Sequence, residues 1–278
     1  MKRIKSFLYS TLSEIVNLCV KASIIGDRKR PSIIENFHAS PNSQFLTMWS
    51  IFLSLLWIPF FCFADPIAYF TPPKDWNCIQ PPTSDPYIRI AFLGKGQSDL
   101  RPSLNLAIEK TDVSLKEYLK SVKSIHENEM KVSWRDLGPF TFIAGKGRLA
   151  EIISPSPLGD VIMLQGIFIQ EGYAYILTGA VLKEEFPQWQ KNLLDALHSL
   201  VIVPNLFSAI RDSSLKKQLQ ETFHSFDRMT NEEERQKQWS VLQKMILNDF
   251  SSMGLHWQIL VLKDGRQKLF PDESKYIQ

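Results

Sequence analysis

The stretch that decides the fold is VIMLQGIFI at residues 161–169, followed by QEG and then by YAYILTGAV at residues 173–181. Both runs are rich in β-branched and aromatic residues, which favour strands. The link between them is short and contains Gly172, as is typical of β-hairpins. These residues therefore predict an antiparallel hairpin, and the neighbouring segments are interpreted around it.

The residues before the hairpin predict further strands. We expect them at residues 87–93, 104–108, 132–137, 140–144 and 149–153. Gly138-Pro139 and Gly145-Lys146-Gly147 separate the last three runs, and dipeptides of this kind favour turns. The region from residue 131 to 181 is therefore interpreted as a meander of antiparallel strands.

Two helices accompany these strands. Ser114 and Glu117 form a capping box, and apolar residues follow at spacings of three and four, with Lys116, Lys120 and Lys123 off that face. A second helix is expected at about residues 184–200. The order shows no parallel βαβ alternation, so we expect the α+β class, an antiparallel sheet with helices packed on one face.

The last 74 residues, 205–278, predict a helical extension. Thr230 and Glu233 indicate a second capping box, and Gly254 has the position of a C-cap. The residues after Gly254 are rich in strand-forming types around Asp264-Gly265. They predict that the chain ends in a small hairpin.

Four short motifs run through this layout. They are FTPPKDW at residues 70–76, SLKEYL at 114–119, YAYILT at 173–178 and the spacing of Trp189, Leu193 and Leu197-His198-Ser199-Leu200. Together they resemble the PsbP-like and DcrB-like family of small α+β domains over about residues 66–204. The resemblance implies an exported, non-catalytic binding or assembly module, because such domains include extrinsic subunits of photosynthetic complexes and envelope proteins. It implies no catalytic residues.

The positive charge of the chain is confined to its beginning. The net charge is +3, but seven basic and three acidic residues before position 45 contribute +4, which leaves −1 for residues 45–278. The folded region is therefore close to neutral, and we expect no nucleic-acid binding.

Residues 45–64 form an uncharged apolar run directly after this basic leader. A helix of this length, at about 1.5 Å per residue, would reach about the thickness of a bilayer's hydrocarbon core. In one interpretation the run is a signal peptide, because Pro59 breaks the helix and the small residues Cys62 and Ala64 precede a cleavage site between Ala64 and Asp65. In the other it remains as a signal anchor with a cytoplasmic N-terminus.

Both interpretations place the rest of the chain outside the cytoplasmic membrane, in the periplasm if the cell is Gram-negative. They leave open whether translation starts at Met1 or near Met48. The predicted organisation is a basic leader (1–44), the apolar run (45–64), an α+β domain (65–204) and the helical extension (205–278).

The sequence offers no pattern of catalytic, cofactor-binding or metal-ligating residues. No two of the five histidines have the spacing of a helical metal site, and there is no nucleophile elbow or phosphate loop. Cys78 is interpreted as a small buried apolar residue. Two glycine clusters, Gly94-Lys95-Gly96 and Gly145-Lys146-Gly147-Arg148, contain basic residues, so Lys95, Lys146 and Arg148 are candidates for the rim of an anion site.

These observations favour a non-enzymatic module that binds a protein partner in the cell envelope. The alternative is a small-molecule or lipid-binding protein with a pocket between sheet and helices. The tryptophans are interpreted as core residues, with a tryptophan-lined groove for a ligand or partner between the sheet and the C-terminal helices as the alternative. A third hypothesis is an enzyme with a dispersed active site. No cofactor is expected, and contact with the membrane would be made through residues 45–64.

Overall fold

The computed structural model describes residues 66–79, 87–96, 98–128 and 131–271. The basic leader, the apolar run at 45–64 and the Ala64–Asp65 bond lie outside the described residues, so the predictions made for them stay predictions. The last residues, 272–278, lie outside as well.

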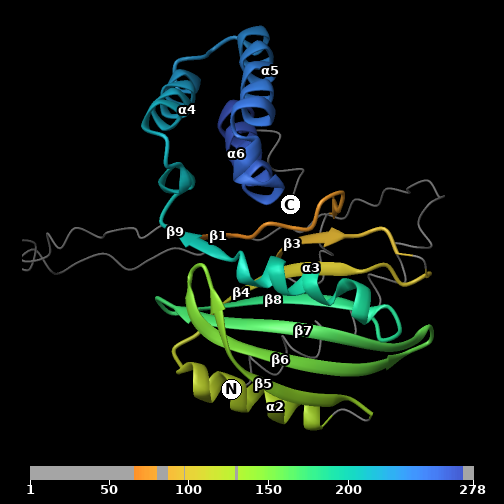
Figure 1. Cartoon of the computed structure of the whole chain (residues 1–278). Coiled ribbons are helices and arrows are strands. Elements are labelled where there is room, and N and C mark those ends of the chain that lie inside the picture. Colours follow the sequence, from red (N-terminus) through yellow and green to blue (C-terminus); the bar gives the residue numbers. More distant parts are fainter. Residues whose placement is uncertain (1–65, 80–86, 97, 129–130, 272–278) are drawn as a thin grey trace, which may run out of the picture.

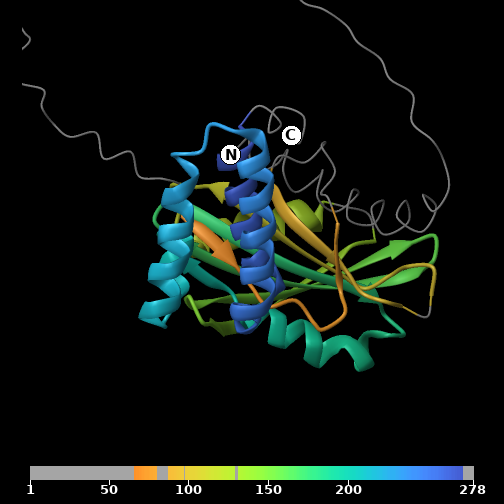
Figure 2. The same ribbon diagram turned by 90° about the horizontal axis from the view of Figure 1, so that it is seen from above.

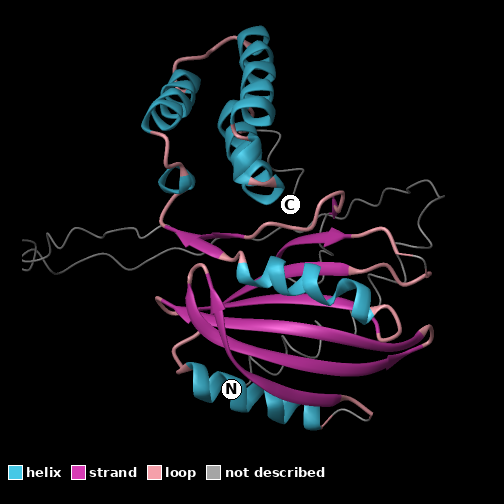
Figure 3. Cartoon of the chain, in the orientation of Figure 1, coloured by secondary structure: helices cyan, strands magenta, loops and turns pink. Residues whose placement is uncertain are grey.

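Seven described strands form an antiparallel sheet in the order β2-β3-β4-β8-β7-β6-β5, which confirms the α+β class (Figure 1). The strands are β2 (Asn77–Ile79), β3 (Ile88–Leu93), β4 (Ser103–Lys110), β5 (Ser133–Phe142), β6 (Gly145–Ser156), β7 (Gly159–Gln170) and β8 (Tyr173–Leu182). Figure 3 shows these strands as the largest layer of the molecule.

The central hairpin is β7–β8, as the sequence predicts. Gln170 pairs with Tyr173, and the two residues between them both have positive φ, 51° at Glu171 and 78° at Gly172. Such a turn twists in the same sense as the strands that it joins. Glycine is favoured at such positions because it has no Cβ.

The meander differs from the prediction in two places. Gly138-Pro139 is not a turn but lies within β5, at an irregularity between Asp136 and Gly138. Gly145 and Gly147 belong to β6, and the turn lies just before them. A Cβ on Gly147 would lie 2.3 Å from the carbonyl oxygen of Ile167, so close packing against β7, not a turn, requires this glycine.

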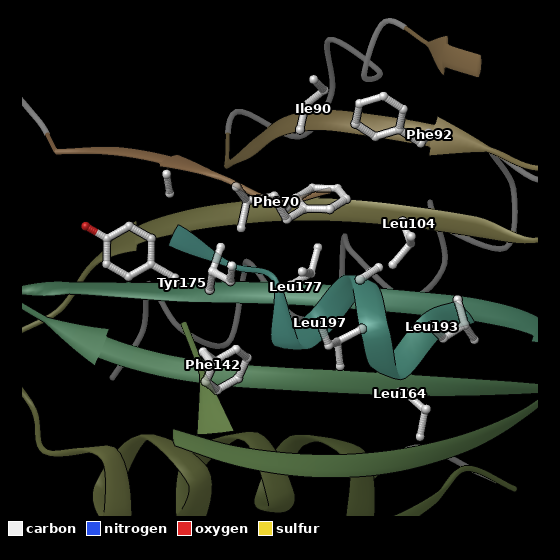
Figure 4. Packing of buried hydrophobic residues seen from close by; sticks show 14 of the residues in the cluster. Phe70, Ile90, Phe92, Leu104, Phe142, Leu164, Tyr175, Leu177, Leu193 and Leu197 are labelled. Atoms are coloured by element: carbon white, nitrogen blue, oxygen red, sulfur yellow. The ribbon is translucent and has the colours of Figure 1, made fainter. Parts of the chain in front are cut away.

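Helices α2 (Leu115–Glu127) and α3 (Phe186–His198) cover opposite faces of the sheet, whereas one shared face was expected. Tyr175 and Leu177 of β8 pack in the cluster that contains Leu193 and Leu197 of α3 (Figure 4). Their neighbour Ile176 packs in the cluster of α2. The central strands are apolar at nearly every position because both of their faces are covered.

The C-terminal extension is helical throughout the described residues. It comprises the 3₁₀ turn η1 (Leu206–Ala209), α4 (Ser213–Phe226), α5 (Glu232–Asp249), η2 (Ser251–Met253) and α6 (Leu255–Leu269). In Figures 1 and 2, α4 and α5 stand side by side above the sheet. Helix α5 is capped by Asn231 instead of Thr230, and Gly254 precedes α6 with a φ of 81°.

The predicted terminal hairpin is wrong, because residues 255–269 form α6. Trp257, Val261, Gly265 and Leu269 recur every four residues and are all buried, so packing against α4 and α5 overrides the β propensity of the run. A Cβ on Gly265 would lie 2.4 Å from Cδ2 of Leu242 in α5. The Asp264-Gly265 pair therefore marks a close helix crossing and not a turn.

The extension joins the sheet unit at one junction. Strand β1 (Ile67–Tyr69) pairs antiparallel with β9 (Val201–Val203), which leads into η1. The ring of His256 of α6 packs against those of Phe70 and Phe92, at centroid distances of 4.9 and 5.8 Å. The N–H of Phe70 donates to Nδ1 of His256 at 3.2 Å, which fixes α6 to the segment that follows β1.

Candidate functional site

A groove of about 660 Å³ lies between α2 and the β5–β6 edge of the sheet. Its walls come from three elements that are separated in the sequence. The volume falls in the range of about 300–1,000 Å³ that is usual for ligand sites. The side chains that line it are Leu115, Lys116, Leu119, Lys120, Lys123, Trp134, Asp136 and Arg148.

Helix α2 is fixed by its buried side, which leaves the opposite flank to line the groove. The predicted capping box is present: Ser114 Oγ accepts from Glu117 N–H at 3.3 Å, and the Glu117 carboxylate accepts from Ser114 N–H at 3.0 Å. Tyr118 is fully buried and donates to the Glu109 carboxylate of β4 at 2.8 Å. Burial raises the pKa of Glu109, although the Tyr118 bond acts in the other direction.

Three exposed lysines, Lys116, Lys120 and Lys123, form the outer wall of the groove. Spacings of four and three residues place them on one flank of the helix. Lys123 pairs with Glu127 at 3.4 Å. Within the described part of the chain, no carboxylate forms an ion pair with Lys116 or Lys120.

The inner wall belongs to the sheet. Asp136 of β5 and Arg148 of β6 form an ion pair, and the Asp136 carboxylate also accepts from the N–H of Gly138 at 2.9 Å. Partial burial tends to raise the pKa of Asp136, but these hydrogen bonds outweigh it and lower the pKa. Among the described residues, the groove therefore has four basic side chains and one carboxylate, which is already bound to Arg148.

The structure brings together only part of the predicted anion rim. Arg148 lines the groove, and the exposed Lys146 lies two residues before it on β6. Lys95 follows β3, and three strands separate β3 from β6 in the sheet. The lysines of α2 were missed as site residues because their spacing is also that of a solvated helix face.

A buried row of polar side chains crosses the α2 face of the sheet. Asn105, Thr178 and Gln165 lie opposite one another on β4, β8 and β7, and each is at most 4% exposed. Gln165 Nε2 donates to Thr178 Oγ1 at 3.4 Å. Asn105 Oδ1 and Gln165 Oε1 are buried and accept no hydrogen bond from any residue that the structure describes. Buried oxygens of this kind are unusual in proteins.

This polar row divides the apolar packing on that face. Ile176 and Ala180 flank Thr178 on β8, and they belong to two different clusters. Trp134 packs against both clusters, and its buried Nε1 has no hydrogen-bond partner among the described residues. Trp134 also lines the groove.

The remaining candidates lie elsewhere. Cys78 is exposed on β2, not buried as expected, because β2 is a short edge strand. His126 and His256 are buried, which lowers the pKa of His126 to about 4 and that of His256 to about 3. Among the described residues, no group of three or more potential ligands could hold a metal ion.

A second, smaller cavity of about 250 Å³ lies where β1, η1 and α6 meet. This is the region in which a tryptophan-lined groove was the alternative prediction. Trp257 of α6 is instead fully buried, and its Nε1 donates to the carbonyl oxygen of Leu206 at 3.2 Å. The cavity is lined by Ile67, Asn205, Leu206, Phe207, Leu260, Lys263, Asp264 and Gln267.

None of the helices in the described ranges has the length and apolar character needed to span a bilayer. The run at 45–64, for which a membrane role is predicted, lies outside those ranges.

Comparisons with known proteins return structural likenesses only, since no protein family model and no curated protein matches the chain. LpqN, involved in cell envelope biogenesis of Mycobacterium tuberculosis, is 13% identical with a TM-score of 0.39, over 50% of this chain and 84% of LpqN. PsbP from the cyanobacterium Synechocystis sp. PCC 6803 is 9% identical with a TM-score of 0.30, over 49% and 86%. A protein from Bacteroides thetaiotaomicron is 13% identical with a TM-score of 0.30, over 74% and 75%.

The second of these proteins bears the name of the family that the sequence motifs resemble. With all three TM-scores below 0.5 and identities of 13% or less, these likenesses assign neither a family nor a function to this chain.

Proposed function

We propose that this chain is a non-enzymatic binding module that holds an acidic segment of a partner protein in the groove beside α2, outside the cytoplasmic membrane. The observation that carries this proposal is the charge of the groove. Lys116 and Lys120 have no ion-pair partner among the described residues, and they line the groove on the wall opposite Arg148.

The charge of the groove is a local property. Residues 45–278 have a net charge of −1, so a general excess of basic residues does not account for four of them in one groove. Basic side chains beside apolar ones, here Leu115, Leu119 and Trp134, suit an acidic partner with some apolar surface. The apolar run at 45–64 and its basic flank support a location outside the membrane, whether the run is cleaved or retained.

The groove chemistry favours binding over catalysis. Its one carboxylate, Asp136, is engaged by Arg148 and the Gly138 N–H, which lower its pKa and make it a poor general base. The other polar side chains of the described lining are cations, and this part of the lining contains no cysteine, serine or histidine. Such a lining can attract and orient an anion, and it contains no nucleophile–base pair.

The second candidate function is small-molecule or lipid binding in the cavity between β1, η1 and α6. Four apolar side chains line it beside Asp264, whose pKa is raised by burial. Its volume of about 250 Å³ lies below the usual range of about 300–1,000 Å³ for ligand sites. We therefore place this function second.

The proposed function is tested by capture from envelope extracts of the source cells with three full-length baits. They are the wild type, the groove variant Lys116→Glu/Lys120→Glu, and the control Lys237→Glu/Lys244→Glu, which makes the same charge change on the exposed face of α5. We expect one or more proteins that the wild type and the control retain and the groove variant loses at least tenfold. Identical recovery with all three baits, or none with any, would overturn the proposal.

A further inference from the structure

The groove lies beside a strand whose outer side is partly open. The sheet ends on β5, and within the described residues no strand pairs with its other side. An edge strand presents backbone N–H and C=O groups at alternate residues to whatever lies beside it. A further extended chain can therefore be added there.

Half of this edge is already occupied. Nδ1 of His198 donates to the carbonyl oxygen of Thr141 at 2.6 Å, and the N–H groups of Ile143 and Ala144 donate to the carbonyl oxygens of His198 and Leu200. The end of α3 therefore covers the second half of β5 and the turn after it. No hydrogen bond of this kind covers Ser133–Leu137 within the described part of the chain.

The free half has a defined end. The irregularity between Asp136 and Gly138 and the proline at 139, which has no N–H, stop regular pairing beyond Leu137. Trp134 and Asp136 of the free half also line the groove. A chain lying along this half of β5 would therefore place one face against the lysine flank of α2.

We infer that the groove holds an extended acidic segment of a partner protein, added to the sheet as a strand along Ser133–Leu137 and directing its acidic side chains at Lys116 and Lys120. This inference rests on the proposed function, and it adds how the partner is held. The main chain of the partner binds the edge of β5. Lys116 and Lys120 select a partner segment with acidic side chains.

The spacing of the two elements supports this arrangement. Side chains on one face of a strand repeat about every 6.7 Å, and residues four apart on a helix rise by about 6 Å. Acidic residues at alternate positions of an extended segment therefore match the spacing of Lys116 and Lys120 on α2. A compact anion would neutralise the same lysines but would leave the backbone groups of Ser133–Leu137 unpaired.

The test uses the full-length protein in mild detergent and a probe peptide of ten alternating glutamate and threonine residues. A second peptide of the same sequence carries N-methyl groups on alternate amides, which removes strand hydrogen bonds and keeps the charge. Citrate and vesicles with an anionic lipid are the competing anions. Binding is followed by fluorescence anisotropy, and hydrogen exchange reports on the amides of residues 133–137.

We expect the unmodified peptide to bind, to slow exchange in residues 133–137 at least fivefold, and to bind at least tenfold more weakly when N-methylated. Binding should also fall at least tenfold with Lys116→Glu/Lys120→Glu and stay within twofold with Lys237→Glu/Lys244→Glu.

If the lysine variant loses binding but N-methylation changes nothing, strand addition is overturned and the proposed function survives. If only citrate or vesicles bind, or if no probe binds, the inference is overturned, and the capture experiment judges the proposed function separately.

Discussion

The two faces of the seven-stranded sheet are built differently. The α3 face is one continuous apolar cluster, and Gly179 allows close approach of α3, because a Cβ there would lie 2.8 Å from Cδ2 of Leu193. The α2 face has two apolar clusters with the polar row of Asn105, Thr178 and Gln165 between them. It also ends in a groove in which Lys116 and Lys120 have no ion-pair partner among the described residues.

This difference indicates that the α3 face stabilises the fold and that the α2 face serves binding. An unbroken apolar face with close helix packing contributes most of the burial that stabilises the fold. Buried oxygens without donors reduce stability. Proteins keep such destabilising polar groups mainly at functional sites. Binding is therefore expected on the α2 face.

The largest effect is expected from a cavity on the α3 face. Leu197→Ala removes a fully buried side chain and should lower the free energy of unfolding by about 3 kcal/mol. Leu119→Ala, which shortens a half-buried side chain on α2, should lower it by about 1 kcal/mol. Urea unfolding measures both values, and equal losses would remove the distinction between the faces.

Two buried histidines should make stability depend on pH: His126 of α2, and His256 of α6, which packs against Phe70 and Phe92 of the cluster on the α3 face. Because burial lowers both pKa values, to about 4 for His126 and about 3 for His256, the unfolded chain binds more protons below about pH 6.5. The stability from each neutral ring is complete above pH 6.5 and is lost as the pH falls, by up to about 1.4 kcal/mol per unit.

Urea unfolding between pH 4.5 and 7 measures this slope. In His126→Leu and in His256→Leu it should be shallower than in the wild type. The second variant also loses the bond from Phe70 N–H and should be less stable at pH 7. A slope that neither substitution changes would mean that other groups cause the acid sensitivity.

Substitution in the polar row should raise the free energy of unfolding, whereas substitution of a core residue lowers it. Gln165→Met keeps a similar volume and removes the buried Oε1 that has no donor, so the free energy of unfolding should rise by about 1 kcal/mol. The effect is measured by thermal unfolding of Gln165→Met. Thr178→Val, which removes the hydroxyl that accepts from Gln165, is measured as the companion variant. A loss of stability with Gln165→Met would show that the row is satisfied in solution and that the two faces are more alike than described.

The smallest effect on stability is expected at the groove lysines. Lys116 and Lys120 are exposed and unpaired among the described residues, so Lys116→Glu/Lys120→Glu should change the free energy of unfolding by less than about 0.5 kcal/mol. The measurement is urea unfolding of the same protein that is used for binding. Destabilisation beyond 1 kcal/mol would mean that these lysines serve the fold.

The sequence predicts the features that local signals encode. The capping box of Ser114 and Glu117 and the Gly172 hairpin depend on neighbouring residues, and both are present. Helix α6 was predicted as a hairpin because the signal that decides it, the contact of Gly265 with Leu242, joins distant parts of the chain. Strand propensity in that run was overridden by packing.

The candidate site was only partly predictable for the same reason. Arg148 was identified, but Trp134 and Asp136 join it through the register of β5 and β6. The polar row exists only once β4, β8 and β7 are aligned. Neither the register nor the position of α2 can be derived from the spacing of these residues along the chain.

The pairing of β1 with β9 has a consequence for the order in which the molecule folds. Tyr69 meets Val201, which is synthesised 132 residues later, so β1 stays without its partner until the whole sheet unit has been made. Contacts of such high sequence separation close slowly. The junction with the helical extension is therefore expected to form last, and a chain that emerges N-terminus first would expose its earliest described strand for longest.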